Sequence, residues 1–164
     1  MTVRIKNNYL TTNNKKYRCS IGRNGFSNNK KEGDGCTPVG VFNITEIYYR
    51  EDKIDQLITN FQPKKILPIY GWCDDPENIK YNTEIEFPFS SSAEKLFRND
   101  TLYDIICVIN YNRDPIIASK GSAIFMHIAS HDYSTTEGCI VLSKDDLKEI
   151  LLTINKDTKI EIGL

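Results

Sequence analysis

The chain has 164 residues, of which 40% are hydrophobic and 26% charged, values that are ordinary for a soluble globular protein. This length fits one domain, residues 1–164, with a core of its own. With 21 basic and 22 acidic residues the formal net charge is −1, which excludes a broad electrostatic footprint for nucleic acid. We interpret the short basic clusters Lys15–Lys16 and Lys30–Lys31 as solvated loop ends.

Short β-rich segments dominate the chain, and turn residues separate them. The predicted strands, in chain order, are Val3–Leu10, Tyr17–Ile21, Gly40–Ile47, Ile105–Tyr111, Ser122–Ala129 and Thr158–Ile162. Turn chemistry is clear at 22–25 and at 33–35, where glycine alternates with polar residues. The pattern therefore predicts a mostly β protein.

One helix is expected near residues 144–154. Ser143 and Asp146 have the spacing of a capping box. The apolar residues that follow recur at helical spacing and are Leu147, Ile150, Leu151 and Ile154. A weaker helix is predicted over Ala93–Phe97, where Ser91 and Glu94 have the same capping spacing, and a short helical turn over Asp55–Thr59.

No secretory leader or membrane-spanning segment is visible in the sequence. Met1–Leu10 has basic residues but no apolar stretch of signal-peptide length. No later run approaches the roughly 20 apolar residues that cross a bilayer. These features predict a cytoplasmic protein, or a periplasmic one if a leader was removed.

The cysteines are five in number and irregularly spaced, which argues against a disulfide framework and a zinc ribbon. Cys107 lies in an apolar strand and Cys19 alternates with apolar residues, so both are interpreted as small buried hydrophobic residues. Only Cys139 has a neighbouring glycine, Gly138, and a histidine nearby. Cys139 is therefore the candidate reactive thiol.

The loop Gly71–Pro76 holds the only tryptophan, Trp72, beside Asp74 and Asp75, and Tyr81 and Asn82 follow it. Loops on a rigid scaffold often carry binding residues, so this one could line a cleft. The alternative is that Trp72 packs the loop against the sheet.

The segment from His127 to Cys139 makes the most specific chemical suggestion in the chain. A thiolate and an imidazole base are the minimum parts of a cysteine nucleophile. Glycine before the cysteine permits a tight turn, and backbone N–H groups there can bind an oxyanion. Because a helix is expected to begin just after Ser143, the helix dipole is predicted to lower the pKa of the Cys139 thiol modestly.

Two alternatives remain open from the residues alone. His131 is a second candidate base, although it lies in a polar loop and His127 ends a strand. His127, His131 and Cys139 could instead be metal ligands, but the His-x3-His spacing suits a helix and this stretch is predicted as strand and loop.

At these residues the sequence resembles the L,D-transpeptidase catalytic domain family. The family signature is a histidine, a spacer, then Ser/Thr-His-Gly-Cys and an apolar residue. Thr136, Gly138, Cys139 and Ile140 match it, whereas Glu137 replaces the second histidine and Val141 replaces the usual arginine or asparagine.

The resemblance is closest to one branch of the family, which includes cytosolic L,D-carboxypeptidases. Three further motifs of that branch are present, in order, and the match extends over roughly residues 17–164. They are Lys31–Gly40 (Lys-Glu-Gly-Asp-Gly-x-Thr-Pro-x-Gly), Gly71–Pro76 with Tyr81–Asn82, and Gly121–His127 (Gly-Ser-Ala-Ile-Phe-x-His).

The resemblance implies a fold and a mechanism. The fold is a β-sandwich-like catalytic domain with short helices in its loops. Cys139 attacks the carbonyl before the terminal D-amino acid of a peptidoglycan stem peptide, His127 is its base, and backbone near Gly138 binds the oxyanion. The carbonyl of Ile128 is implied to orient His127.

The fate of the acyl-enzyme decides the activity that the resemblance implies. Water gives an L,D-carboxypeptidase acting on muropeptides, which we favour because no leader is seen and because Glu137 and Val141 differ from the cross-linking enzymes. A second stem peptide gives an L,D-transpeptidase making 3-3 cross-links, and a binding module without turnover is the alternative from another class. No cofactor or metal is expected, and the candidate substrate-binding residues are Arg23, Lys31, Trp72, Asp74, Asp75, Tyr81, Thr136 and Glu137.

Overall fold

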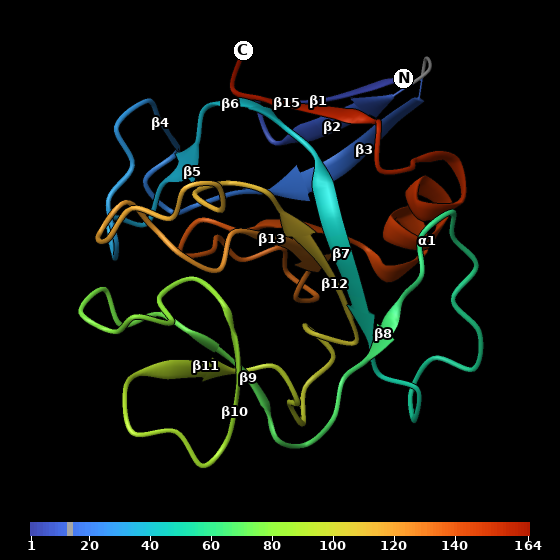
Figure 1. Ribbon diagram of the computed structural model, residues 1–164. Helices are drawn as coiled ribbons and strands as arrows, with labels where there is room; N and C mark the ends of the chain where they lie inside the picture. The colour runs from blue at the N-terminus through green and yellow to red at the C-terminus, as the bar shows by residue number, and fades with distance from the viewer. Residues whose placement is uncertain (13–14) are drawn as a thin grey trace.

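A ten-stranded curled sheet forms the body of the protein in the computed structural model, which describes residues 1–12 and 15–164 (Figure 1). Its strand order is β6-β15-β1-β2-β3-β14-β13-β12-β7-β8. The bounds of these strands are β1 Thr2–Lys6, β2 Tyr9–Thr12, β3 Lys15–Ser20, β6 Gly40–Phe42, β7 Ile44–Tyr49, β8 Lys64–Lys65, β12 Ile105–Ile109, β13 Phe125–Ile128, β14 Ile140–Leu142 and β15 Lys159–Ile162.

Two smaller sheets and one helix complete the described part of the chain. The three-stranded sheet β10-β9-β11 consists of Glu84–Glu86, Tyr70–Cys73 and Ala93–Lys95, and the two-stranded sheet pairs β4 Phe26–Ser27 with β5 Thr37–Pro38. In Figure 1 the three-stranded sheet lies at the bottom, away from β1, β15 and both termini at the top. The mostly β prediction with one helix is confirmed.

The helix α1 (Lys144–Thr153) begins where the capping box predicts. The Ser143 hydroxyl accepts a hydrogen bond from the Asp146 N–H at 3.1 Å, which satisfies one of the free amides of the first turn. Its apolar stripe is buried, with Leu147, Ile150 and Leu151 fully enclosed. Among the residues that the structure describes, no helix has the length and apolar character to cross a bilayer.

The centre of the large sheet is covered on both faces, which is why its strands are apolar runs. On one face α1 packs over Met126, Ile140 and their neighbours. On the other face Phe125, Ile106 and Val108 pack against Trp72 and Leu96 of the three-stranded sheet and its flank. The candidate thiol, Cys139, borders this second core.

The two weaker helix predictions are wrong. Ala93–Lys95 is strand β11, paired antiparallel with β9 so that Glu94 lies opposite Trp72. The Ser91 hydroxyl accepts a hydrogen bond from the Asn78 side chain at 2.7 Å and caps no helix. Strand pairing thus overrides a weak local preference. Residues 55–59 form no helical turn either; they connect Ile54 and Phe61, which are both buried in the core.

Candidate active site

A cleft of about 510 Å³ opens beside strands β13 and β14. Its walls come from the ends of both strands, from β11, and from the loops around residues 30–33, 98–103, 122–124 and 130–139. Cys139 and His127 both line it, together with Gly138, Thr136, Glu137 and Asp74. The cleft thus gathers six of the eleven residues that the sequence proposes for the site.

The strand register brings Cys139 and His127 to one face. β13 and β14 are parallel, with Met126 opposite Ile140 and His127 opposite Val141. Because side chains alternate along a strand, Cys139 lies beside Phe125 on the face that His127 also occupies. Adjacent strands and a two-residue step place the Cα atoms of His127 and Cys139 about 8 Å apart, a separation that two facing side chains can bridge.

His127 is buried and held in one tautomer. Its Nδ1 lies 3.0 Å from the Ile128 carbonyl and 3.2 Å from the Leu102 carbonyl. Because both partners accept, Nδ1 carries the proton and Nε2 keeps a lone pair. The Tyr103 ring packs edge-on at 4.8 Å. Burial lowers the pKa of His127 to about 4, so the imidazole is neutral at pH 7.

The pKa of the Cys139 thiol is raised, which contradicts the prediction that the helix dipole lowers it. Burial raises its pKa to about 12, the nearby Glu94 carboxylate raises it further, and the Phe125 backbone amide and Lys30 lower it. Strand β14 separates Cys139 from α1, and a helix dipole acts only near the first turn. Although the residue keeps some exposed surface, its Sγ donates to the Ala123 carbonyl at 3.2 Å. Desolvation therefore outweighs the dipole.

Two threonine hydroxyls hold the backbone at Gly138 and Cys139, one on each of two successive peptides. The Thr37 hydroxyl donates to the Gly138 carbonyl at 2.9 Å, and the Thr136 hydroxyl donates to the Cys139 carbonyl at 2.6 Å. In a trans peptide the N–H points opposite to the C=O. Because the Gly138 carbonyl points toward Thr37, the Cys139 N–H points away from Thr37. Gly138 has φ +146°, and a Cβ there would lie 2.7 Å from the Cys36 carbonyl oxygen. Only glycine fits this turn.

Glu137, which departs from the family signature, stands at the exposed rim of the cleft. Its carboxylate forms an ion pair with Arg23. The Arg23 backbone N–H also donates to the Thr136 carbonyl at 2.8 Å. Arg23 does not line the cleft itself, so it holds Glu137 and Thr136 in place from outside the cleft.

Trp72 and Tyr81 lie behind the cleft wall. Trp72 is 1% exposed, packs edge-on against Phe125 at 5.1 Å and donates through Nε1 to Asn82 Oδ1 at 3.0 Å. The same oxygen accepts the Ala123 N–H at 3.0 Å, and Ala123 in turn holds the Cys139 thiol. Tyr81, also buried, donates to the Glu32 carboxylate, which lines the cleft.

The remaining predicted binding residues divide between the cleft and the surface. Asp74 lines the cleft, and its buried Oδ1 has no hydrogen-bond partner among the described atoms. Asp75 lies outside the lining and accepts the Glu77 N–H at 3.0 Å in a local turn. Lys31 is exposed and also lies outside the lining.

Several cleft residues were not singled out from the sequence. Glu32, Glu94, Arg98, Tyr103 and Lys30 all line it. Lys30 contradicts the interpretation as a solvated loop end, because it is only 4% exposed. Its position directly before the Lys31–Gly40 motif was the available signal. Glu94 was obscured by the wrong helix prediction, since a strand residue points to one face of its sheet.

No metal cluster is found in the described ranges 1–12 and 15–164, where no three His, Cys, Asp or Glu side chains gather as ligands. His131 is exposed and does not line the cleft that holds His127 and Cys139.

The sequence matches the family of the L,D-transpeptidase catalytic domain (YkuD) over residues 2–162, and the chain belongs to that family. None of the curated proteins matches it. The chain is therefore an L,D-transpeptidase-type enzyme, of a family that carries out acyl transfer on peptidoglycan.

Proposed function

We propose that this protein is an L,D-carboxypeptidase that removes the terminal D-alanine from muropeptide tetrapeptides through a Cys139 thioester. The observation that supports it is a thiol and a neutral, oriented imidazole on one face of adjacent strands in one cleft. A cytoplasmic location and a single catalytic domain over residues 1–164 are parts of the same proposal.

The first chemical step is attack of Sγ on the peptide carbonyl while His127 Nε2 takes the thiol proton. Burial opposes a preformed thiolate–imidazolium pair, because the thiol pKa is raised to about 12 and the imidazole pKa lowered to about 4. Proton transfer therefore accompanies attack, as in general-base catalysis. The Cys139 N–H stabilises the oxyanion.

Collapse of the tetrahedral intermediate completes acylation. The C–N bond breaks, His127 returns the proton to the leaving amine, and D-alanine departs. Water, deprotonated by the same imidazole, then attacks the thioester and releases the shortened peptide and the thiol.

The charge of the cleft favours water over an amine as the acceptor. The charged groups of the lining are four carboxylates and two permanent cations, namely Glu32, Asp74, Glu94, Glu137, Lys30 and Arg98. Each cation is paired with an aspartate, and Glu137 is paired with Arg23, so Glu32, Asp74 and Glu94 supply the unbalanced negative charge. Nearby carboxylates raise the pKa of an approaching amine and keep it as a non-nucleophilic ammonium. Water is unaffected, so hydrolysis is the expected outcome.

Among the candidate binding residues, Asp74, Thr136 and Glu137 are proposed to contact the substrate directly, because they line the cleft. Tyr81 and Arg23 are proposed to act through Glu32 and Glu137. Substrate roles for Lys31, Trp72 and Asp75 stay predictions.

Incubation with a disaccharide tetrapeptide, followed by mass spectrometry, tests the proposed function. We expect a product lighter by one D-alanine residue and no dimer. A cross-linked dimer would instead identify a transpeptidase. Unchanged substrate with saturable binding would identify a binding module and contradict the enzyme assignment.

Replacing the proposed base should abolish most of the activity. We expect His127→Ala to lower kcat by about 10²–10⁴-fold, whereas His131→Ala keeps it. Because burial lowers the pKa of His127 to about 4, the acid limb of kcat/KM in the wild type should have its midpoint well below the usual 6.5. Retained activity in His127→Ala with loss in His131→Ala would move the base to His131.

A further inference from the structure

We propose that Lys30 is a positioning residue that keeps a fixed positive charge beside Cys139 and so favours the thiolate as the nucleophile forms. The proposal rests on the proposed function, in which Cys139 is the nucleophile. It concerns a side chain just before the Lys31–Gly40 motif that the sequence alone places in solvent.

Lys30 is buried although its neighbours Asn29 and Lys31 are exposed. Its side chain is 3% exposed and lines the same cleft as Cys139. A lysine is rarely enclosed in this way unless its charge has a partner. Here the partner is Asp34, whose Oδ1 lies 2.7 Å from Nζ, and the Lys31 carbonyl accepts a second hydrogen bond at 3.2 Å.

Two glycines of the site make room for the lysine stem. A Cβ on Gly121 would lie 2.9 Å from Lys30 Cε, and one on Gly138 would lie 3.5 Å from the same atom. The stem thus passes directly beside the residue that precedes the nucleophile. This contact ties the charge of Lys30 to the Gly138–Cys139 turn.

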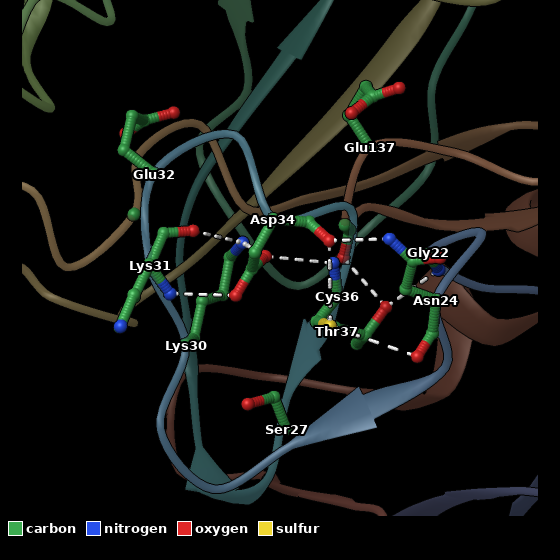
Figure 2. Close-up of polar contacts among 12 residues, drawn as sticks. Gly22, Asn24, Ser27, Lys30, Lys31, Glu32, Asp34, Cys36, Thr37 and Glu137 are labelled. Carbon is green, nitrogen blue, oxygen red and sulfur yellow. Dashed lines mark hydrogen bonds and ion pairs between the residues drawn. The ribbon is translucent and has the colours of Figure 1, made fainter.

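Asp34 holds the other end of the pair in the loop (Figure 2). Its Oδ1 also accepts the Cys36 N–H at 2.9 Å, and Oδ2 accepts the Lys31 N–H at 2.7 Å. These contacts and the Lys30 ammonium hold the pKa of Asp34 below its usual value. The carboxylate is therefore anchored on the loop, and the ammonium that it binds stands at the end of a stem that passes beside Gly138.

The other charges around Cys139 mostly oppose a thiolate. The carboxylates of Glu32, Asp74, Glu94 and Glu137 line the same cleft as Cys139. Of these, Glu94 raises the pKa of the Cys139 thiol. Arg98 is bound to Asp100 at 2.5 Å, Tyr103 donates to Glu94, and His127 is neutral. Lys30 is the cation that lowers the pKa of Cys139, so its removal leaves negative charge unopposed.

The test measures the alkylation rate of Cys139 by iodoacetamide from pH 6 to 9, resolved from the other cysteines by peptide mass spectrometry. Below the thiol pKa the rate follows the thiolate fraction, which changes tenfold for each unit of pKa. We expect Lys30→Met, which keeps the apolar stem, to slow alkylation roughly tenfold. Lys30→Arg should restore most of the rate.

Asp34→Asn separates the electrostatic role from a structural one. This variant removes the negative charge that neutralises Lys30. The thiolate fraction of Cys139 should therefore rise and alkylation should become faster, the opposite of the change expected for Lys30→Met. A loop that is merely loosened would change both variants in the same direction. The exposed Lys120→Met, beside Gly121, is the matched control and should leave the rate unchanged.

Equal or faster alkylation in Lys30→Met, or slower alkylation in Asp34→Asn, overturns the proposal. Should Lys30→Met fail to fold in a thermal melt, the other two variants still decide, because the proposal requires faster alkylation in Asp34→Asn together with a rate near that of the wild type in Lys30→Arg. Because alkylation needs no substrate, this pattern can hold even if no D-alanine is released. Failure of the proposed function and failure of this inference are therefore distinguishable.

Discussion

Replacing Cys139 with alanine should abolish release of D-alanine, with a loss of about 10⁴-fold or more in kcat, as expected when a covalent nucleophile is removed. The residue is only partly buried at the edge of the second core. We therefore expect the melting temperature to change by only a few degrees. The measurement is the product assay together with a thermal melt.

Cys36→Ser is the matched control for this loss. Cys36 is also partly exposed, and its Sγ lies 3.7 Å from the Asn24 and Asp34 carbonyls, outside the cleft lining. Its variant should keep full turnover. Turnover that survives in Cys139→Ala would remove Cys139 from the mechanism altogether.

The parts of the fold that were predictable are those in which local pattern and burial agree. The apolar run at Ile105–Ile109 is buried on both faces of the sheet, and the capping box at Ser143 begins α1. Val3–Leu10 was predicted as one strand but is two, because Asn7 and Asn8 take positive φ and turn the chain. Asparagine tolerates that conformation.

The parts that were missed depend on pairing between distant segments. β9 and β11 are short and weakly patterned, and their strand character comes from pairing within the three-stranded sheet, in which β9 pairs with β10 on one side and with β11 on the other. Glutamate is depleted in strands, so at Glu94 the capping spacing with Ser91 favours a helix when only the local sequence is considered.

For the candidate site, residue types and family motifs single out Cys139, His127 and Gly138 from the sequence alone, and all three line one cleft. The thiol pKa could not be inferred in the same way. The direction in which this pKa shifts depends on how completely the surrounding side chains exclude water, and here burial outweighs the distant helix dipole. The burial of Lys30 was also not predictable, because it needs the space left by Gly121 and Gly138 and the anchored Asp34 carboxylate.

Trp72→Ala should cost about 3–5 kcal/mol of unfolding free energy, because a fully buried large ring leaves a cavity. For a chain of this length that lowers the melting temperature by roughly 10 °C. The loss should also loosen Phe125, against which the ring packs at 5.1 Å. A denaturant titration measures the change.

Trp72→Phe distinguishes packing from substrate contact. It keeps a ring against Phe125 and removes the Nε1 donor, while Asn82 Oδ1 still accepts the Ala123 N–H. If Trp72 acts from behind the wall, by supporting the Asn82–Ala123 contact that holds the thiol, this variant loses about 1 kcal/mol of stability with KM unchanged. A raised KM at unchanged stability would show that the ring reaches the substrate.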